Sequence, residues 1–509
     1  MIKGEPGLHM CNVLDYLEQT ASVYSDRIAV DDGKTTLTWK ELRDNSKKIG
    51  TFLLDKSERQ KPIVILMEKS TTTLSVMFGA VYAGCFYVMV DPGQPADRVK
   101  RILNVLNAEI VITICENEKL LDEAMYQGER VLLDNYFPEE IDEIGLAGVR
   151  DSSNGSDLLY GIFTSGSTGI PKGIVVSHKA VIDFISHFKD LFGFSEEDRI
   201  GNQAPFDFDV SVKDIYTSVM TGATLVLIPR QMFSTPPVLL DYLEEKRISS
   251  LTWAVSALTL VTALKGLKYK VPHDVKKILF SGEVMPTKHL KMWREALPDA
   301  RFVNLYGPTE ITCNCTYFEI PSDFSTEDKL PIGISFPGRR VFLRDDEGNE
   351  VTTPFVVGEI CVEGESLSEG YYNNEAETKK RFLYFDKDNF KKRFYCTGDL
   401  GYFDEQGLLY FSGRKDFQIK HMGHRIELEE IEQSINKIPG VLRSCCLMNE
   451  KRQQLVAFYF GSTSPDDVRV ELKKSVPVYM VPHKILQTDE MPLNKNGKTD
   501  RDFLRKKLM

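Results

Sequence analysis

A stretch rich in glycine and hydroxyl residues, FTSGSTGIPKG at 163–173, has the residue types to hold an anion. Gly166, Gly169 and Gly173 let backbone amides approach a bound group closely, and Lys172 adds a compact positive charge. The stretch does not fit the Walker pattern G-x-x-x-x-G-K-[ST], because a proline precedes its lysine. By themselves these residues are consistent with a phosphate-binding loop or with a Gly/Ser surface linker.

The elements around this stretch predict an α/β fold. Short apolar runs indicate buried strands, and an amphipathic pattern between two of them, at 95–108, indicates a helix. The five runs lie at 62–67, 86–90, 109–114, 222–228 and 276–282. After about residue 330 the pattern changes to paired strands, with a later amphipathic helix at 426–438. We therefore expect a large α/β domain, a smaller β-rich portion and a small C-terminal α+β domain that begins near 413–416.

The composition limits the classes of partner and the compartment. The 509 residues carry a net charge of −11 without a dense Lys/Arg stripe, which argues against nucleic acid as the main partner. Nine cysteines and the absence of a signal-like N-terminal apolar run favour reduced thiols and a cytoplasmic location. Residues 70–90 carry no charge over 21 positions, but Ser/Thr residues and Ala83-Gly84 interrupt them. This segment predicts a buried helix followed by a buried strand, and no membrane span.

Eight motifs occur in the order found in the adenylate-forming superfamily, which includes acyl-CoA synthetases, luciferases and the adenylation domains of nonribosomal peptide synthesis. The chain resembles this family over nearly its whole length. The motifs are YAGCFYVMVDP (82–92), TSGSTGIPKG (164–173), FDVSVKDIY (208–216), NLYGPTE (304–310), GEICVEGESLSEGYYN (358–373), YCTGDLGY (395–402), GRKDFQIKHMGHRIELEEIE (413–432) and PLNKNGKTDR (492–501). The resemblance implies two parallel-rich sheets plus the β-rich portion in an N-terminal adenylation core, residues 1–415, and a mobile C-terminal lid, residues 416–509.

The family activates a carboxylic acid with ATP, releases pyrophosphate and passes the acyl group to a thiol, so the resemblance implies ATP and Mg²⁺. The implied catalytic residues are Lys498, Lys172 and Glu310, with Glu310 also binding the metal. The implied ATP-binding residues are Thr164, Ser165, Gly166, Ser167, Thr168, Gly169, Lys172, Tyr306, Gly307, Thr309, Asp399, Arg414 and Lys498. Lys498 is expected to reach both the substrate carboxylate and the α-phosphate.

The resemblance also implies a moving lid. Asp416 occupies the family's hinge position, and rotation there would withdraw Lys498 after adenylation. Residues 421–425, HMGHR, would then face the active site for thioester formation.

Asp209 is the residue that predicts the class of acid. It matches the aspartate with which amino-acid-activating members pair the substrate ammonium, although it could instead cap the following helix. We expect an amino acid substrate. The implied pocket residues are Asp209, Val210, Lys213, Ala254, Leu279, Ser281, Leu305, Cys313 and Asn314.

Lys213 is the unusual member of this pocket. The stretches APFDFDVSVKDIYTSVMTGATL (204–225) and LFSGEVMP (279–286) resemble stand-alone D-alanine–carrier protein ligases, which typically have an apolar residue at the position of Lys213 and a cysteine at that of Ser281. Lys213 could pair with an acidic substrate side chain or with the carboxylate of a β-amino acid, or it could lie on the outer face of its helix and reach water. The sequence leaves these alternatives open.

The acceptor thiol is expected to come from a separate protein. No carrier domain or phosphopantetheine site follows Arg501, so an acyl or peptidyl carrier protein acting in trans is the expected partner. Carrier proteins are usually acidic, and the basic residues 414–425 are expected to form part of the docking face. The alternatives are an acyl- or aryl-CoA synthetase of the same superfamily, and a nucleotide-binding scaffold that has lost its chemistry.

Overall fold

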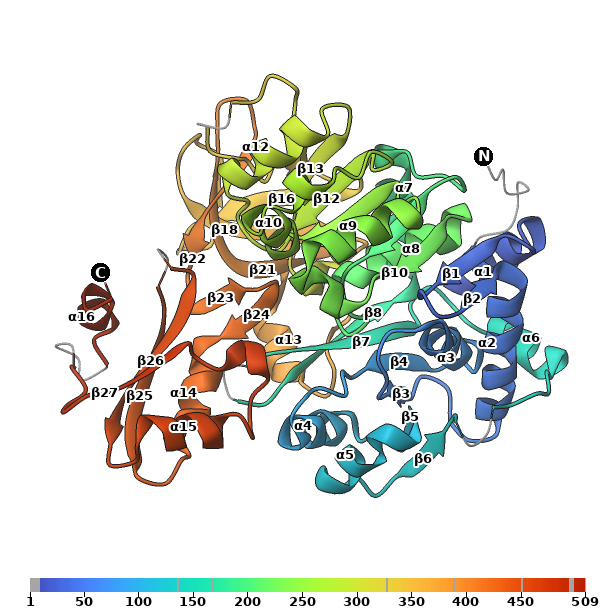
Figure 1. Cartoon of the computed structure of the whole chain (residues 1–509), viewed down its shortest axis with the longest axis horizontal. Helices are drawn as coiled ribbons and strands as arrows, with labels where there is room; N and C mark the ends of the chain where they lie inside the picture. The colour runs from blue at the N-terminus through green and yellow to red at the C-terminus, as the bar shows by residue number, and fades with distance from the viewer. Residues whose placement is uncertain are drawn as a thin grey trace.

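The computed structural model describes residues 10–134, 137–166, 169–325, 328–387, 390–449, 452–493 and 499–508 (Figure 1). It confirms the predicted α/β class: two large sheets dominated by parallel strands, an antiparallel sheet and a small C-terminal α+β part.

The first large sheet has seven strands, five of which run parallel. The glycine-rich stretch connects two of its neighbours, β7 and β8, which pair antiparallel. In spatial order the strands are β19 (Gly370–Tyr371), β8 (Lys172–Ser177), β7 (Leu158–Thr164), β4 (Phe86–Met89), β3 (Pro62–Ile65), β5 (Ile110–Thr113) and β6 (Glu129–Leu132).

The second large sheet has nine strands, and its parallel centre contains the strands whose ends carry predicted pocket residues. In spatial order they are β15 (Ile334–Ser335), β14 (Thr316–Glu319), β13 (Arg301–Tyr306), β12 (Lys277–Ser281), β11 (Ser250–Ala254), β9 (Arg199–Asn202), β10 (Thr224–Leu227), β1 (Ile28–Asp31) and β2 (Thr36–Thr38).

The main hydrophobic core joins the two large sheets through the helices that pack between and beside them. Two of these, α7 (His178–Phe192) and α8 (Val210–Thr221), contact each other, and all twelve residues of α8 are buried. A helix with no exposed face must bury any charged residue it carries, and α8 buries Lys213 and Asp214.

The uncharged segment 70–90 folds as predicted, into helix α3 (Thr71–Tyr82) and strand β4. Helix α3 packs closely on α2 (Trp39–Leu54): a Cβ atom at Gly79 would lie 2.5 Å from Cγ2 of Ile49. No helix in the described ranges is long and apolar enough to cross a membrane.

A six-stranded antiparallel sheet forms the predicted β-rich portion. It contains β16 (Arg339–Arg344), β17 (Glu350–Val351), β18 (Gly358–Gly364), β20 (Phe382–Lys387), β21 (Phe390–Phe403) and β22 (Leu409–Arg414). The next strand, β23 (Gln418–His421), leaves this sheet and pairs with β24 (His424–Glu427). The chain therefore changes sheets between Arg414 and Gln418, around the residue predicted as the hinge.

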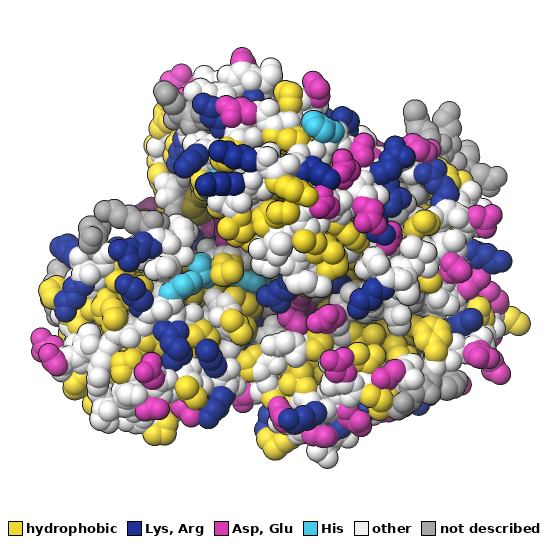
Figure 2. Space-filling model, viewed as in Figure 1, with side chains coloured by type: hydrophobic (Ala, Val, Ile, Leu, Met, Phe, Trp, Pro, Cys, Tyr) yellow, Lys and Arg dark blue, Asp and Glu magenta, His cyan; other side chains and the backbone are white. Residues whose placement is uncertain are grey.

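The C-terminal part has a hydrophobic core of its own. Three strands, β25 (Val441–Asn449), β26 (Gln454–Gly461) and β27 (Lys484–Gln487), pack with α14 (Leu428–Asn436), α15 (Pro465–Leu472) and α16 (Arg501–Lys506). Figure 2 shows this part as a lobe at the lower left, with a hollow between it and the rest of the molecule. The β23–β24 hairpin lies on the side of the lobe that faces the large sheets (Figure 1).

Candidate active site

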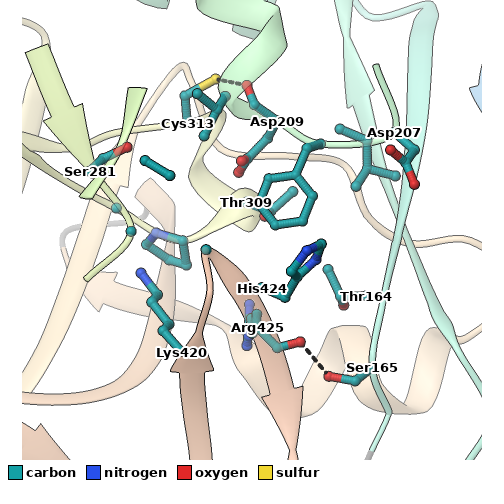
Figure 3. Close-up of a pocket in the computed structure, with 18 of the residues that line it drawn as sticks. Thr164, Ser165, Asp207, Asp209, Ser281, Thr309, Cys313, Lys420, His424 and Arg425 are labelled. Carbon is teal, nitrogen blue, oxygen red and sulfur yellow. Dashed lines mark hydrogen bonds between the residues drawn. The ribbon is translucent and has the colours of Figure 1, made fainter. Parts of the chain in front are cut away.

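A cavity of about 70 Å³ lies where the two large sheets meet the β23–β24 hairpin (Figure 3). Its walls come from the end of β7, the start of α8, the ends of β11 and β12, the loop after β13 and the hairpin. Ligands bind preferentially beyond the carboxyl ends of parallel strands, and these strand ends surround the cavity.

Seven of the nine predicted pocket residues line this cavity: Asp209, Val210, Lys213, Ala254, Ser281, Cys313 and Asn314. Leu279 and Leu305 do not line the cavity, so the prediction that they are pocket residues is wrong. Both side chains are fully buried in the main hydrophobic core, because their positions lie before the ends of β12 and β13, where the large sheets are already packed.

The carboxylate of Asp209 points into the cavity (Figure 3). Asp209 occupies the N-cap position of α8, but its side chain makes no capping hydrogen bond. No hydrogen-bond or ion-pair partner of this carboxylate lies among the described residues; its backbone carbonyl accepts from Sγ of Cys313 at 3.2 Å. The helix-cap alternative is therefore wrong, and an uncompensated carboxylate faces the cavity.

Lys213 lies one helical turn after Asp209 and is 1 % exposed. Its Nζ donates to Oδ1 of Asn314 at 2.9 Å and lies 3.3 Å from Oγ of Ser281. Burial lowers the pKa of Lys213, although the carboxylates of Asp209 and Asp214 act in the opposite direction. The outer-face alternative is wrong, because α8 has no exposed face.

The glycine-rich stretch contacts the lid as well as the cavity. Thr164 and Ser165 line the cavity, and the Ser165 hydroxyl donates to the carbonyl oxygen of Arg425 at 2.9 Å. The amide of Gly166 donates to Oε2 of Glu430 at 3.1 Å, so one amide of the stretch already holds an anionic oxygen. Of the other predicted residues, Ser167 and Thr168 lie outside the described residues, whereas Gly169 has a φ of +74° that favours glycine.

Lys172 begins β8 outside the cavity and forms an ion pair with Oε1 of Glu377 at 2.8 Å. Glu310, the predicted magnesium ligand, is 1 % exposed and also paired. Arg425 contacts its Oε2 at 2.7 Å, and the Tyr371 hydroxyl donates to its Oε1 at 2.7 Å. Although burial alone would raise the pKa of Glu310, these two neighbours lower it to about 2.

Three predicted nucleotide-binding residues, Tyr306, Asp399 and Arg414, are linked to one another by hydrogen bonds and an ion pair. The Tyr306 hydroxyl donates to Oδ2 of Asp399 at 2.6 Å, and Arg414 pairs with the other oxygen of Asp399. Nε of Arg414 also donates to Oδ1 of Asp416 at 2.6 Å, which ties these residues to the predicted hinge.

Gly307 and Thr309 line the cavity beside this chain of contacts. A Cβ atom at Gly307 would lie 2.6 Å from Cα of Asn314, which accounts for the glycine.

The hairpin contributes three side chains to the cavity: Lys420, His424 and Arg425. The ring of His424 stacks on Tyr479 with centroids 3.6 Å apart. Burial, together with nearby positive charges, lowers the pKa of His424 to about 3, so its imidazole is neutral near pH 7. The HMGHR segment thus faces the active site in this structure, whereas Lys498 lies outside the described residues.

A buried ion pair joins the lid to the core. Nη1 of Arg98, on α4 (Ala96–Leu106), lies 2.9 Å from Oε1 of Glu430, and their side chains are 3 % and 0 % exposed. Arg98 belongs to none of the recognised motifs, so sequence reasoning missed it. The available signal was its place on the apolar face of an amphipathic helix, beside the buried Val99 and Ile102.

The expectation that 414–425 forms a basic docking face is wrong. Arg414, Lys420 and Arg425 are turned toward Asp399, the cavity and Glu310. Lys415 is the exposed basic residue of the segment, and it pairs with Asp346 and Glu359. The positive charges of the segment are therefore directed inward.

Comparison with known proteins identifies the family and the fold. A family model described as AMP-binding enzyme matches residues 17–372. The chain is 31% identical over 504 residues to a D-alanine--D-alanyl carrier protein ligase of Staphylococcus aureus (strain Newman), covering 97% of this chain and 98% of that protein. It is 30% identical over 496 residues to Tyrocidine synthase 1 of Brevibacillus parabrevis, covering 96% of this chain but 44% of that protein's length.

The fold matches that of the Vibrio cholerae adenylation domain AlmE, solved in complex with glycyl-adenosine-5'-phosphate, with a TM-score of 0.86. That match covers 100% of this chain and 99% of the other at 21% identity, and it supports the fold alone. The family model spans well over half of the sequence, and four of the eight recognised motifs contribute residues to one cavity. The chain therefore belongs to the AMP-binding, adenylate-forming enzyme family.

Proposed function

We propose that this protein activates an amino acid with ATP, forms the aminoacyl-adenylate with release of pyrophosphate, and transfers the aminoacyl group to the phosphopantetheine thiol of a separate carrier protein. The observation that carries the choice of an amino acid is the unpartnered carboxylate of Asp209 in the cavity. A buried carboxylate is costly without a cation, and a substrate ammonium would supply one.

The first half-reaction brings a carboxylate close to an anionic triphosphate, so it depends on positioning and charge screening. In the proposal the 164–172 loop binds the β- and γ-phosphates, Asp399 accepts from the ribose hydroxyls, and Lys498 contacts both reacting groups. The amide of Gly166 fits a phosphate oxygen, since it already donates to the carboxylate oxygen of Glu430.

Glu310 is the residue that would hold Mg²⁺ together with phosphate oxygens. Mg²⁺ usually takes one or two carboxylates plus substrate phosphates, so a single carboxylate is sufficient on the protein side. No cluster of three or more His, Cys, Asp or Glu residues suited to a metal occurs in the described part of the chain. Because Arg425 pairs with Glu310 in this structure, Glu310 becomes available to the metal when the lid withdraws Arg425. Bound Mg²⁺ would screen the phosphate charge.

The second half-reaction uses the lid position seen here. Arg425 forms an ion pair with Glu310, the predicted metal ligand, and Glu430 accepts a hydrogen bond from the Gly166 amide of the predicted phosphate loop. Both contacts compete with bound Mg²⁺ and phosphate, so this position follows the release of pyrophosphate. We propose that rotation near Asp416 removes Lys498 from the active site. The same rotation brings in the β23–β24 hairpin with its cavity residues Lys420 and His424.

The partner of this step is proposed to be a carrier protein supplied in trans. The similarity to a stand-alone carrier protein ligase over 97% of the chain supports this choice. An acyl- or aryl-CoA synthetase of the same superfamily is the alternative.

The test is ATP–pyrophosphate exchange with amino, aryl and fatty acids, followed by transfer to phosphopantetheinylated carrier proteins or to CoA. We expect exchange with amino acids and a mass increase on a carrier protein. Exchange with aryl or fatty acids alone, or transfer to CoA alone, would refute the proposal.

A further inference from the structure

Helix α8 presents two opposite charges to the same cavity, one turn apart, at Asp209 and Lys213. Residues four apart on a helix are neighbours, with Cβ atoms roughly 5–6 Å apart. The two side chains nevertheless form no ion pair with each other, and no other described residue forms an ion pair with either. The cavity therefore offers a separate anionic and a separate cationic contact point.

The surroundings of Lys213 are neutral at contact distance. Its Nζ has three donors, and the partners in the structure are the amide oxygen of Asn314 and the hydroxyl of Ser281. Asp214, the next acidic side chain, accepts from Nδ2 of Asn202 at 2.9 Å. Consecutive helix positions do not face each other, and Asp214 forms no ion pair with Lys213, although its charge acts to raise the pKa of that lysine.

A neutral substrate side chain would leave this buried ammonium without a counter-charge at contact distance, since Asp209 and Asp214 act on it without forming an ion pair. Completely buried lysines are rare unless they are paired, because transfer of an unpaired charge from water is expensive. A small aliphatic pocket residue would avoid that cost, so the lysine is better explained by an anionic ligand group.

We infer that the substrate is an amino acid with a second carboxylate, which Lys213 binds through its ammonium while Asp209 binds the substrate's amino group. This inference rests on the proposed amino acid activation and narrows its substrate class. The carboxylate oxygens would take the free donor of Lys213, and Asn314 and Ser281 would keep the lysine oriented.

The positions of the lining residues assign the two carboxylates different roles. Ser281 and Cys313 lie at the end of the cavity opposite Thr164 and Ser165 (Figure 3). Activation requires a carboxylate at the end near the glycine-rich stretch, whereas Lys213 lies beside Ser281 at the other end. A β-amino acid with a single carboxylate could not occupy both ends, so the structure favours an amino dicarboxylic acid over that alternative.

The test compares ATP–pyrophosphate exchange for aspartate and glutamate, in both chiral forms, with asparagine, glutamine, alanine, glycine, β-alanine and phosphoserine. We expect kcat/KM for one dicarboxylic acid to exceed that of its amide by on the order of 10²–10⁴ fold, because the amide leaves the buried charge unpaired. Preference for a neutral amino acid or for phosphoserine overturns the inference but leaves amino acid activation standing. Exchange with none of the amino acids refutes the proposed function itself.

The variant Lys213→Met keeps a side chain of similar length without its charge. We expect kcat/KM for the dicarboxylic acid to fall at least about 100-fold, and the ratio of neutral to dicarboxylic exchange to rise. Lys291→Met, at an exposed position of α12 (Thr287–Ala296), is the matched control and should leave both rates unchanged. Equal losses for neutral and dicarboxylic acids in Lys213→Met, with an unchanged melting temperature, would contradict a role in specificity.

Discussion

At the scale of single residues, the distinctive feature of the cavity is two charged side chains that form no ion pair with any described residue. Asp209 has a carboxylate without a described cation, and Lys213 has an ammonium held by neutral oxygens. Other charges in the site are paired, as in Glu310 with Arg425 and Arg98 with Glu430. Unpaired charges in a closed cavity indicate where a ligand supplies the missing partner.

The variant Asp209→Asn tests this reading for the amino group. Loss of the charged partner of a desolvated ammonium costs about 3–5 kcal/mol, so kcat/KM for amino acid exchange is expected to fall by about 10²–10⁴ fold. KM for ATP should change little. The control Asp241→Asn alters an exposed aspartate on α9 (Pro236–Glu245) that pairs with Lys270. Normal amino acid kinetics in Asp209→Asn would rule out an ammonium-binding role.

Lys498 allows the two half-reactions to be separated. Replacement by alanine removes the preorganised charge proposed for adenylation and is expected to slow pyrophosphate exchange by on the order of 10²–10³ fold or more. Transfer from separately supplied aminoacyl-adenylate to the carrier should continue at a rate close to that of the unmodified protein. If that transfer slows equally in single-turnover measurements, the lysine is not specific to the first step.

At the scale of elements, the loop between β7 and β8 depends on backbone geometry more than on side chains. A Cβ atom at Gly166 would lie 2.0 Å from the carbonyl oxygen of Ile170, a distance that forces the loop to shift. The amide of Gly166 contacts an anionic oxygen of the lid in this structure. The same amide is proposed to contact phosphate when the lid is elsewhere.

The variant Gly166→Ala is therefore expected to raise KM for ATP by about tenfold or more, with KM for the amino acid nearly unchanged, because a displaced amide loses a charge-assisted hydrogen bond worth about 1.5–3 kcal/mol. Gly148→Ala is the control, since a Cβ atom there has no heavy atom within 4 Å. An unaltered KM for ATP would separate this loop from phosphate binding.

At the scale of the whole molecule, the C-terminal part contacts the core through buried and half-buried groups. Arg98 and Glu430 form an ion pair with almost no exposure, and Nη2 of Arg101 donates to the carbonyl oxygen of Ser475 at 2.9 Å. The amide of Gly423 donates to Oε1 of Glu283 at 2.8 Å. Separation of the two parts would expose Arg98 and Glu430 to water, so their pairing favours the arrangement seen here.

The variant Arg98→Met tests this lid position. Removing one partner of a buried ion pair costs roughly 3–5 kcal/mol, which would disfavour this position of the C-terminal part by about 10²–10⁴ fold. We expect slower transfer to the carrier protein, with pyrophosphate exchange unchanged or faster. Arg150→Met, which alters a partly exposed pair on the core, is the control. Loss of both half-reactions together would mean that the ion pair supports folding instead.

Local sequence determined much of the architecture. The apolar runs at 62–67 and 222–228 form strands, and 95–108 contains a helix. A continuous apolar run and a helical periodicity are both patterns of neighbouring residues, so the sequence shows them directly. The segment 70–90 forms the predicted helix and strand for the same reason. The eight ordered motifs established the family, because each fixes several residue types at short spacing.

Tertiary structure decided the orientation and pairing of charges. The sequence could not exclude a capping role for Asp209 or an outward Lys213, because a helix has several faces and only its packing shows which of them is exposed; α8 is buried on all sides. Packing also placed Leu279 and Leu305 in the core and turned the basic residues of 414–425 inward. Arg98 and Glu430 are 332 residues apart, so no local pattern could pair them. The sequence therefore determined the elements and the family, whereas the burial of charges, which depends on distant segments meeting, was decided by the folded structure.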